Sequence, residues 1–146
     1  RNGKPIAGAT GVAYKVTAAD AGASIVARAT LTKAGAKSVT LTTTATEIPK
    51  LRPTVKAKLA KKSIKASARA KVTVTVKVSG VAGPAGKVKV KFGKKTKTYT
   101  LKAASNGKRT VKLPKLKKGA HKIKGTFMGT QQIERRTSKT VKLKVR

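Results

Sequence analysis

The sequence lacks the residues that most catalytic and metal-binding sites require. Its 146 residues include no cysteine, no tryptophan, one histidine and only three acids. Without cysteine, a disulfide framework and thiolate metal sites are excluded. A carboxylate calcium site and a glycosidase pair are excluded too, because Glu134 is the only acid after residue 49. His121 has no second ligand, so we interpret it as a half-buried residue of a sheet and expect no metal and no cofactor.

Motifs for catalysis and membrane insertion are missing as well. No G-x-S-x-G elbow is present, and the glycines at 83–86 lack the strand–loop–helix context of a phosphate-binding loop. A lysine–asparagine isopeptide crosslink is disfavoured, because Asn106 falls in a predicted turn and Glu134 in a predicted loop. No apolar run approaches the length of a transmembrane helix. We therefore expect no enzyme activity and no transmembrane segment in these residues.

Positive charge dominates the chain and is unevenly distributed. Lys and Arg number 37 against three acids, for a net charge of +34. Residues 1–49 hold six Lys/Arg and two acids, whereas residues 50–146 hold 31 and one. Such a surface attracts nucleic acid, anionic wall polymers or acidic lipid headgroups non-specifically. Because lysine far outnumbers arginine, diffuse charge is favoured over bidentate recognition.

Strict alternation over residues 71–92 predicts two strands. Valines at 72–78 alternate with Thr and Lys, and after a Gly/Pro loop Val88, Val90 and Phe92 alternate with lysines. Period-2 alternation gives each strand an apolar and a cationic face, and argues against the disorder that high charge can signal. Similar patterns predict further strands at 55–59, 96–102, 111–113, 121–127 and 141–145, with a hairpin turn at Asn106-Gly107 and a loop or edge strand over 60–70. Seven short strands predict a β-sandwich.

Residues 1–48 show the same alternation with far less charge. We predict strands over 12–16, 25–31 and 39–43, a turn at 33–37, and a corner at 17–22 in which Asp20 accepts backbone N–H bonds. Two prolines in residues 49–53 predict a semi-rigid linker. The expected organisation is therefore residues 1–48, a linker at 49–53, and a cationic sandwich over 54–146.

The C-terminal pattern resembles the L-x-x-G-x-H-x-V-x-V-x-Y-x-G run of bacterial Ig-like repeat domains. The matching positions are Leu116, Gly119, His121, Ile123, Phe127 and Gly129. The resemblance covers about residues 53–146 and departs at Gly125, where a β-branched residue is usual, and at Thr130, where Asp is usual. It implies a seven-stranded Ig-like β-sandwich in an all-β protein.

Residues 1–45 are similar to the second half of a different Ig-like repeat of secreted Gram-positive surface proteins. The similarity is carried by RNGKPIAGAT, Tyr14, and the segment from Thr17 to Gly22. The strands that precede this turn in the family are absent before Arg1, so the resemblance implies an open sheet edge and a half-built core. We expect either a fragment or a neighbouring chain that completes this part. Repeats of this kind serve as spacers, adhesion modules and wall-associated appendages of secreted or cell-surface proteins.

Seven lysines form the candidate site. In an Ig-like sandwich the strands near 88, 123 and 143 share one sheet, and their outward positions are Lys87, Lys89, Lys91, Lys122, Lys124, Lys142 and Lys144. A solvated face that keeps the protein soluble would normally mix charges of both signs. Like charges opposite one another destabilise a sheet. We therefore favour a polyanion-binding face, and we disfavour sequence-specific reading of nucleic acid because aromatics and arginine are scarce.

These observations lead to one leading hypothesis and two alternatives. The leading hypothesis is a non-catalytic surface or stalk module whose lysines attach to an anionic cell-wall polymer or an acidic protein surface. One alternative is a nucleic-acid-binding or virion-decorating β module that uses the same face non-specifically. The other is a filament or assembly subunit completed by strand addition from a neighbouring chain.

Overall fold

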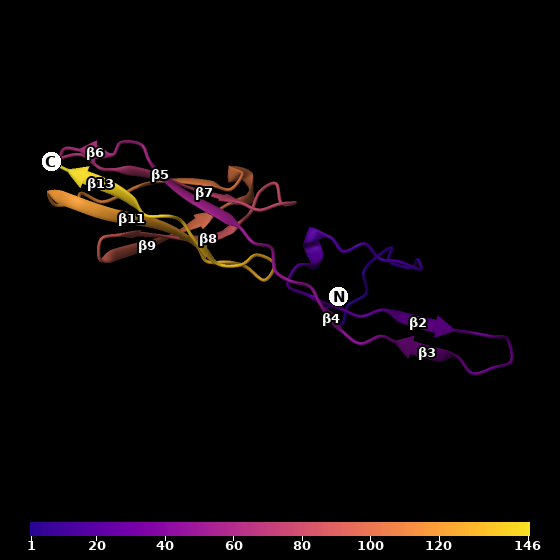
Figure 1. Ribbon diagram of the computed structural model, residues 1–146. Helices are drawn as coiled ribbons and strands as arrows, with labels where there is room; N and C mark the ends of the chain where they lie inside the picture. The colour runs from indigo at the N-terminus through magenta and orange to yellow at the C-terminus, as the bar shows by residue number, and fades with distance from the viewer.

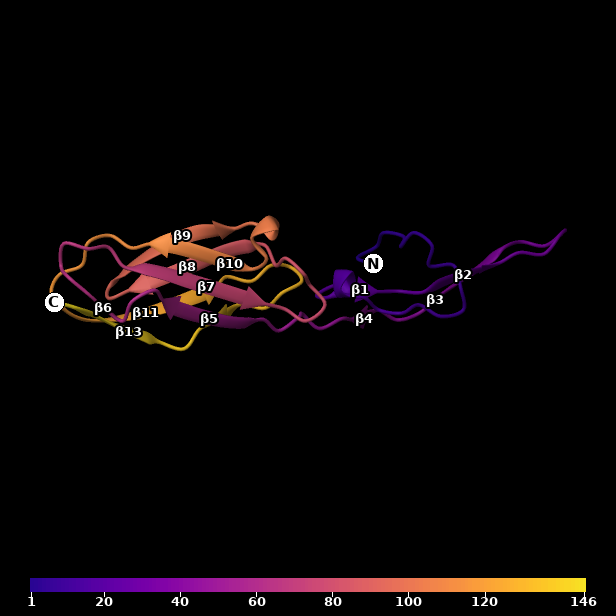
Figure 2. The same cartoon turned by 90° about the horizontal axis from the view of Figure 1, so that it is seen from above.

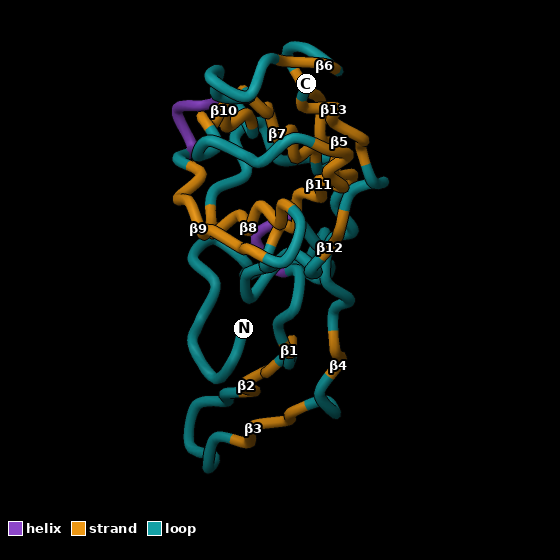
Figure 3. The backbone as a smooth tube through the Cα atoms, turned by 90° about the vertical axis from the view of Figure 1, so that its left-hand side faces the viewer, coloured by secondary structure: helices purple, strands orange, loops and turns teal.

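Two mainly antiparallel sheets, packed face to face, form the larger part of the computed structural model, which describes all residues from 1 to 146 (Figure 1). The smaller sheet has the order β10-β7-β5, from β5 (Thr54–Leu59), β7 (Lys71–Lys77) and β10 (Lys108–Lys112). The larger sheet has the order β6-β13-β11-β8-β9, from β6 (Ser63–Ile64), β8 (Gly86–Phe92), β9 (Lys95–Leu101), β11 (Gly119–Phe127) and β13 (Val141–Val145). Figure 3 shows these two layers, with β10, β7 and β5 above β9, β8 and β11. The predicted all-β sandwich with seven main strands is confirmed.

Alternating residues of both sheets build the core. Val72, Val74 and Val76 of β7 face Val88 and Val90 of β8, and all five side chains are almost fully buried. Eighteen buried hydrophobic residues form one cluster. Burying one valine-sized side chain contributes about 1.5–3 kcal/mol, so this cluster is the main source of stability.

The two sheets approach closely at Gly125. A Cβ at this position would lie 2.8 Å from Cγ2 of Val74 on the opposite sheet. The N–H of Gly125 donates to Oγ of Ser138 at 3.0 Å, and the N–H of Ser138 donates back to the Gly125 carbonyl at 2.8 Å. Glycine therefore replaces the usual β-branched residue because Val74 already occupies the space.

Two connections are more ordered than expected. The 60–70 segment is a loop that contains β6, which pairs in parallel with β13. The loop after β11 contains β12 (Arg136–Thr137), a two-residue strand that pairs with β11. The turn predicted at Asn106-Gly107 follows the short helical turn η2 (Ala103–Ser105), and Asn106 adopts the left-handed conformation. The prediction that this turn closes a hairpin is wrong, because β9 and β10 belong to different sheets and the turn connects the two layers.

Residues 1–48, which we call the first unit, lie beyond one end of the sandwich. They contain η1 (Ala18–Asp20), β1 (Ser24–Ile25), β2 (Arg28–Leu31), β3 (Val39–Thr42) and β4 (Thr46–Glu47). β1 pairs with β4 and β2 pairs with β3. The β2–β3 hairpin points away from the sandwich in both Figure 1 and Figure 2.

The prediction of a strand over residues 12–16 is wrong. This segment is irregular, and the side chain of Val12 is fully exposed. Alternation alone does not make a strand, because the backbone groups also need a partner strand and none lies beside this segment. Only Tyr14 is fixed there, by a hydrogen bond from its hydroxyl to Oδ2 of Asp20 at 2.8 Å.

One face of the β2–β3 hairpin is apolar and uncovered. Leu31 lies opposite Val39, and Ala29 lies opposite Leu41. Leu31, Val39 and Leu41 are each more than half exposed. The polar residues of these strands, including Thr30 and Thr40, take the other face.

Candidate polyanion-binding surface

The larger sheet places all seven predicted lysines on its outer side. On β8, the outward lysines alternate with Val88, Val90 and Phe92, which are buried. β11 and β13 show the same alternation around Ile123 and Leu143. All seven side chains are exposed. We call them the lysine face: Lys87, Lys89, Lys91, Lys122, Lys124, Lys142 and Lys144.

The register of the strands concentrates charge at two positions on the lysine face. Lys91 lies directly opposite Lys124, and Lys122 lies directly opposite Lys142. Directly opposed residues have Cβ atoms about 4.5–5.5 Å apart, so each pair brings like charges together. The other lysines of this face lie opposite neutral residues, such as Thr98 opposite Lys89.

No acidic side chain compensates this charge. Asp20 is buried in the first unit, and Glu47 lies on β4. Glu134 lies in the loop after β11, where its Oε1 is 3.7 Å from Nε of Arg52. The potential over the lysine face is therefore positive throughout, and it extends about 8–10 Å from the surface at moderate salt.

A second cationic face, which was not among the predicted sites, covers the outer side of the smaller sheet. Its members are Lys56, Lys58, Lys71, Lys77, Lys108 and Lys112, all exposed. Here the central strand contributes Thr73 and Thr75, which separate the lysines of the two edge strands. Only Lys71 and Lys112 are directly opposed. The alternation of Lys with Val55, Ala57 and Leu59 was the signal that could have revealed this face.

Aromatic side chains are not arranged for stacking on bases. Phe92 and Phe127 are buried in the core. The ring of Tyr99 is half-buried, with Nζ of Lys97 at 6.0 Å from its centroid. Tyr14 lies in the first unit and is bound to Asp20. The surface can attract anionic groups, but it offers no aromatic platform of the kind that single-strand binders use.

Histidine and the acids occupy structural positions. His121 is half-buried, and its Nε2 donates to the carbonyl of Lys117 at 2.8 Å, because a carbonyl can only accept. No group of three or more His, Cys, Asp or Glu side chains is placed to hold a metal ion. The two helical segments are three-residue turns, far too short to cross a bilayer.

Asp20 is the centre of the corner predicted at residues 17–22. Its Oδ2 accepts the N–H of Thr17 at 2.8 Å and the hydroxyl of Tyr14, and its Oδ1 lies 3.2 Å from the guanidinium of Arg1. The backbone hydrogen bond from Thr17 is the main reason that the pKa of Asp20 is lowered. The same carboxylate raises the pKa of Tyr14, chiefly through their hydrogen bond. The corner is a fixed element of the first unit.

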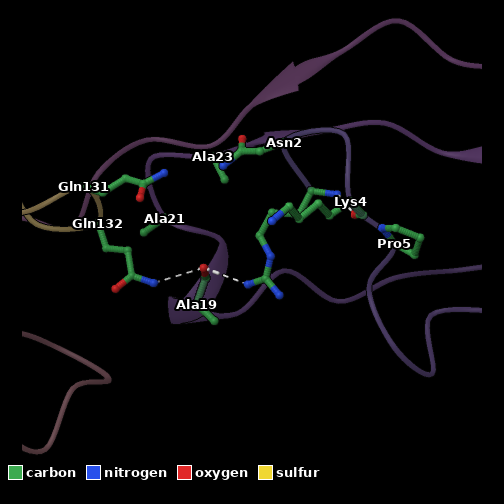
Figure 4. Close-up of a pocket in the computed structure, with 9 residues that line it drawn as sticks. Asn2, Lys4, Pro5, Ala19, Ala21, Ala23, Gln131 and Gln132 are labelled. Carbon is green, nitrogen blue, oxygen red and sulfur yellow. Dashed lines mark hydrogen bonds between the residues drawn. The ribbon is translucent and has the colours of Figure 1, made fainter.

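The first unit is tied to the sandwich by the loop that follows β11. The side chains of Gln132 and Arg1 both donate to the carbonyl of Ala19, at 3.1 and 2.9 Å (dashed lines in Figure 4). The N–H of Leu51 donates to the carbonyl of Gln132 at 2.8 Å. Gly22, with φ +71°, lies against the carbonyl of Gln131, where a Cβ would collide. These contacts join both the first unit and the 49–53 segment to the loop after β11.

The comparisons with known proteins concern the sandwich. The family model for a bacterial Ig-like domain (group 3) matches residues 57–146. This match confirms the resemblance carried by Leu116 to Gly129. No curated protein and no solved structure matches the chain.

Proposed function

Because the chain belongs to the family of bacterial Ig-like domains, we propose that it is a non-catalytic surface or stalk module whose lysine face attaches to an anionic cell-wall polymer. Domains of this family are generally structural modules rather than enzymes. The proposed location is the cell surface, where such polymers and such modules meet. An acidic protein surface would engage the same lysines.

The single observation that carries this proposal is the acid-free lysine face with its two directly opposed lysine pairs. A face kept only for solubility would mix both signs of charge. Opposed like charges cost stability in the free protein. A bound polyanion removes that cost, because its negative groups lie between the ammonium groups and screen them from each other.

Binding would consist of many weak contacts. Each lysine that neutralises an anionic group releases condensed counterions from the polymer, so the affinity falls steeply as salt rises. Lysine ammonium groups act as flexible point charges and impose little geometry on the polymer. The interaction would therefore tolerate polymers of different sequence, provided that the charge density is high.

The test is a comparison of polymers at matched charge density. We expect the protein to bind poly(glycerol phosphate), polyglutamate and single-stranded DNA with affinities that fall steeply as salt rises. We also expect it to co-sediment with isolated cell walls at low salt. A clear preference for DNA would instead favour the nucleic-acid alternative. Failure of all three polymers to bind would overturn the electrostatic function.

The uncovered apolar face of the β2–β3 hairpin favours assembly as a second candidate function. Leu31, Val39 and Leu41 leave an exposed apolar surface that a strand or sheet from another chain could cover. The solution mass without added polyanion tests this candidate at low and high salt. A salt-resistant multimer supports assembly, whereas a monomer under both conditions contradicts it.

A further inference from the structure

A hollow of about 420 Å³ lies at one end of the lysine face, beside the turn between β8 and β9. It is lined by Lys91, Lys122 and Lys124 together with Gly93, Ala120 and His121. Its volume falls in the range of pockets that take small ligands, about 300–1,000 Å³. This part of the lysine face is therefore a concave site, in addition to being charged.

Small residues create the hollow. Ala120 occupies an outward position on β11 that is followed by Lys122 and Lys124 in the same row. The β8–β9 turn brings Gly93 against β11, where its N–H donates to the carbonyl of Lys122 at 3.2 Å. Neither Gly93 nor Ala120 has a side chain long enough to fill the space between the lysines.

Two further contacts keep the wall of the hollow in place. Lys91 and Lys124 are directly opposed across the β8–β11 pair, so both side chains start from fixed neighbouring positions. The hydrogen bond from Nε2 of His121 to the carbonyl of Lys117 holds the preceding loop against the start of β11. The hollow is thus defined by strand register and by one hydrogen bond from a side chain to the backbone.

The chemistry of the lining points to phosphate. Three ammonium groups can approach a tetrahedral anion from different sides, and lysine is a common phosphate ligand because it acts as a point charge. No arginine lines the hollow, so the anion would be held by point charges and not by a planar guanidinium fork. No acidic side chain lines it either. The volume leaves room for a phosphate group and part of the unit to which it is esterified.

We propose that this hollow, formed by Lys91, Lys122 and Lys124 over Ala120 and Gly93, binds one phosphate group of the anionic polymer. The inference rests on the proposed function, because the hollow is part of the lysine face. The remaining lysines of the face would contact the polymer diffusely, while the hollow fixes one phosphate and favours phosphate polymers over carboxylate polymers.

The probe is inorganic phosphate, followed by amide chemical shifts of Gly93 and Ala120 at constant ionic strength, with acetate as the reference anion. We expect saturable shifts with phosphate and none with acetate. Ala120→Leu places a larger side chain in the hollow without changing charge and should abolish the saturable shift of Gly93. Thr98→Leu, an exposed substitution elsewhere on the same sheet, should leave it intact.

A charge-matched pair of variants completes the test. Lys91→Gln with Lys124→Gln removes two charge-assisted hydrogen bonds and should weaken phosphate binding about tenfold or more. Lys56→Gln with Lys58→Gln removes the same charge from the other sheet and should change the affinity for phosphate less than about twofold, because long-range charge is screened. Equal losses in both variants, or shifts that survive Ala120→Leu, would overturn the site.

Polymer binding separates this inference from the proposed function. If the hollow is a phosphate site, Ala120→Leu weakens poly(glycerol phosphate) and single-stranded DNA but not polyglutamate. The ratio of the affinities for poly(glycerol phosphate) and single-stranded DNA then identifies the source of the phosphate. If polymers bind the wild type and Ala120→Leu equally, the assignment of a phosphate site to the hollow is wrong and the proposed function stands. If phosphate binds but no polymer does, the proposed function fails instead.

Discussion

Lys124 of β11 lies directly opposite Lys91 of β8, and no acidic side chain lies on their face of the sheet. This pairing is unfavourable in the free protein because the two ammonium groups repel each other. Lys89, two residues away on the same strand, lies between Thr98 and Thr126 and has no such neighbour. Lys91 is therefore a strained position of the lysine face, and Lys89 is a matched position without this strain.

Replacing Lys91 with Thr should stabilise the protein. The substitution removes one partner of the opposed pair and introduces a residue suited to strands, so we expect a gain of about 0.2–1 kcal/mol at low salt. Urea unfolding measures it, with Lys89→Thr as the control of equal charge change. The difference between the two variants should shrink at high salt. Equal effects of both substitutions would show that the register of Lys91 and Lys124 does not matter.

Replacing Gly125 with Val should destabilise the sandwich. The new side chain would collide with Val74, and overpacking of this kind costs about 1–3 kcal/mol. Val74→Ala in the same chain removes the colliding methyl groups and should recover part of the loss. A double-mutant cycle by chemical denaturation measures this coupling. Strictly additive effects would contradict the close approach of the two sheets at Gly125.

The corner around Asp20 should open only in acid. The pKa of Asp20 in the folded chain lies below its ordinary value of 3.8, so the stability it adds is complete above that pH. That contribution is lost as the pH falls through the lower, folded-state pKa. Hydrogen exchange of the Thr17 amide follows the change, since this N–H donates to Asp20. In Asp20→Asn the Thr17 amide should exchange fast already at neutral pH and should lack this acid transition. An unchanged pH profile of exchange would rule out the carboxylate as the cause.

Replacing Gly22 with Ala should loosen the first unit from the sandwich. The new Cβ would collide with the carbonyl of Gln131, in addition to the strain of a positive φ. Gly35 has a similar φ of +75° but open space around it, so Gly35→Ala is a control for backbone strain alone. The small-angle scattering curve should change, and the rate of proteolysis within residues 46–53 should rise, for Gly22→Ala only. If both variants behave alike, the contact with Gln131 does not hold the junction.

Alternation predicted the sandwich well, because a strand buried on one side must alternate. The strands around Val74, Val88 and Leu143 lie where the pattern placed them, and the lysines between them point outward. The same pattern failed at residues 12–16, where no partner strand accepts the backbone hydrogen bonds. Local pattern thus gives the face of a strand but not the existence of its neighbour.

The remaining features depend on contacts between distant residues. Gln132 and Ala19, which help to join the first unit to the sandwich, are 113 positions apart. The hollow depends on Gly93 reaching Lys122, and the opposed pair depends on the β8–β11 register. Lysines at outward positions of the smaller sheet were readable from residues 54–59. The separation of these lysines by threonines of β7 was not readable, because it depends on which strands are neighbours in the sheet.

The most direct test of the account compares the two cationic faces at equal charge. One variant carries Gln at Lys91, Lys122, Lys124 and Lys142, and the other carries Gln at Lys56, Lys58, Lys108 and Lys112. Binding to poly(glycerol phosphate), with duplex DNA alongside, is measured as a function of salt. We predict that the first variant loses affinity strongly and that its DNA salt slope falls by about 0.9 per lysine, whereas the second stays close to wild type. Equal losses in both variants would mean that net charge alone drives binding, and would contradict the assignment of the lysine face.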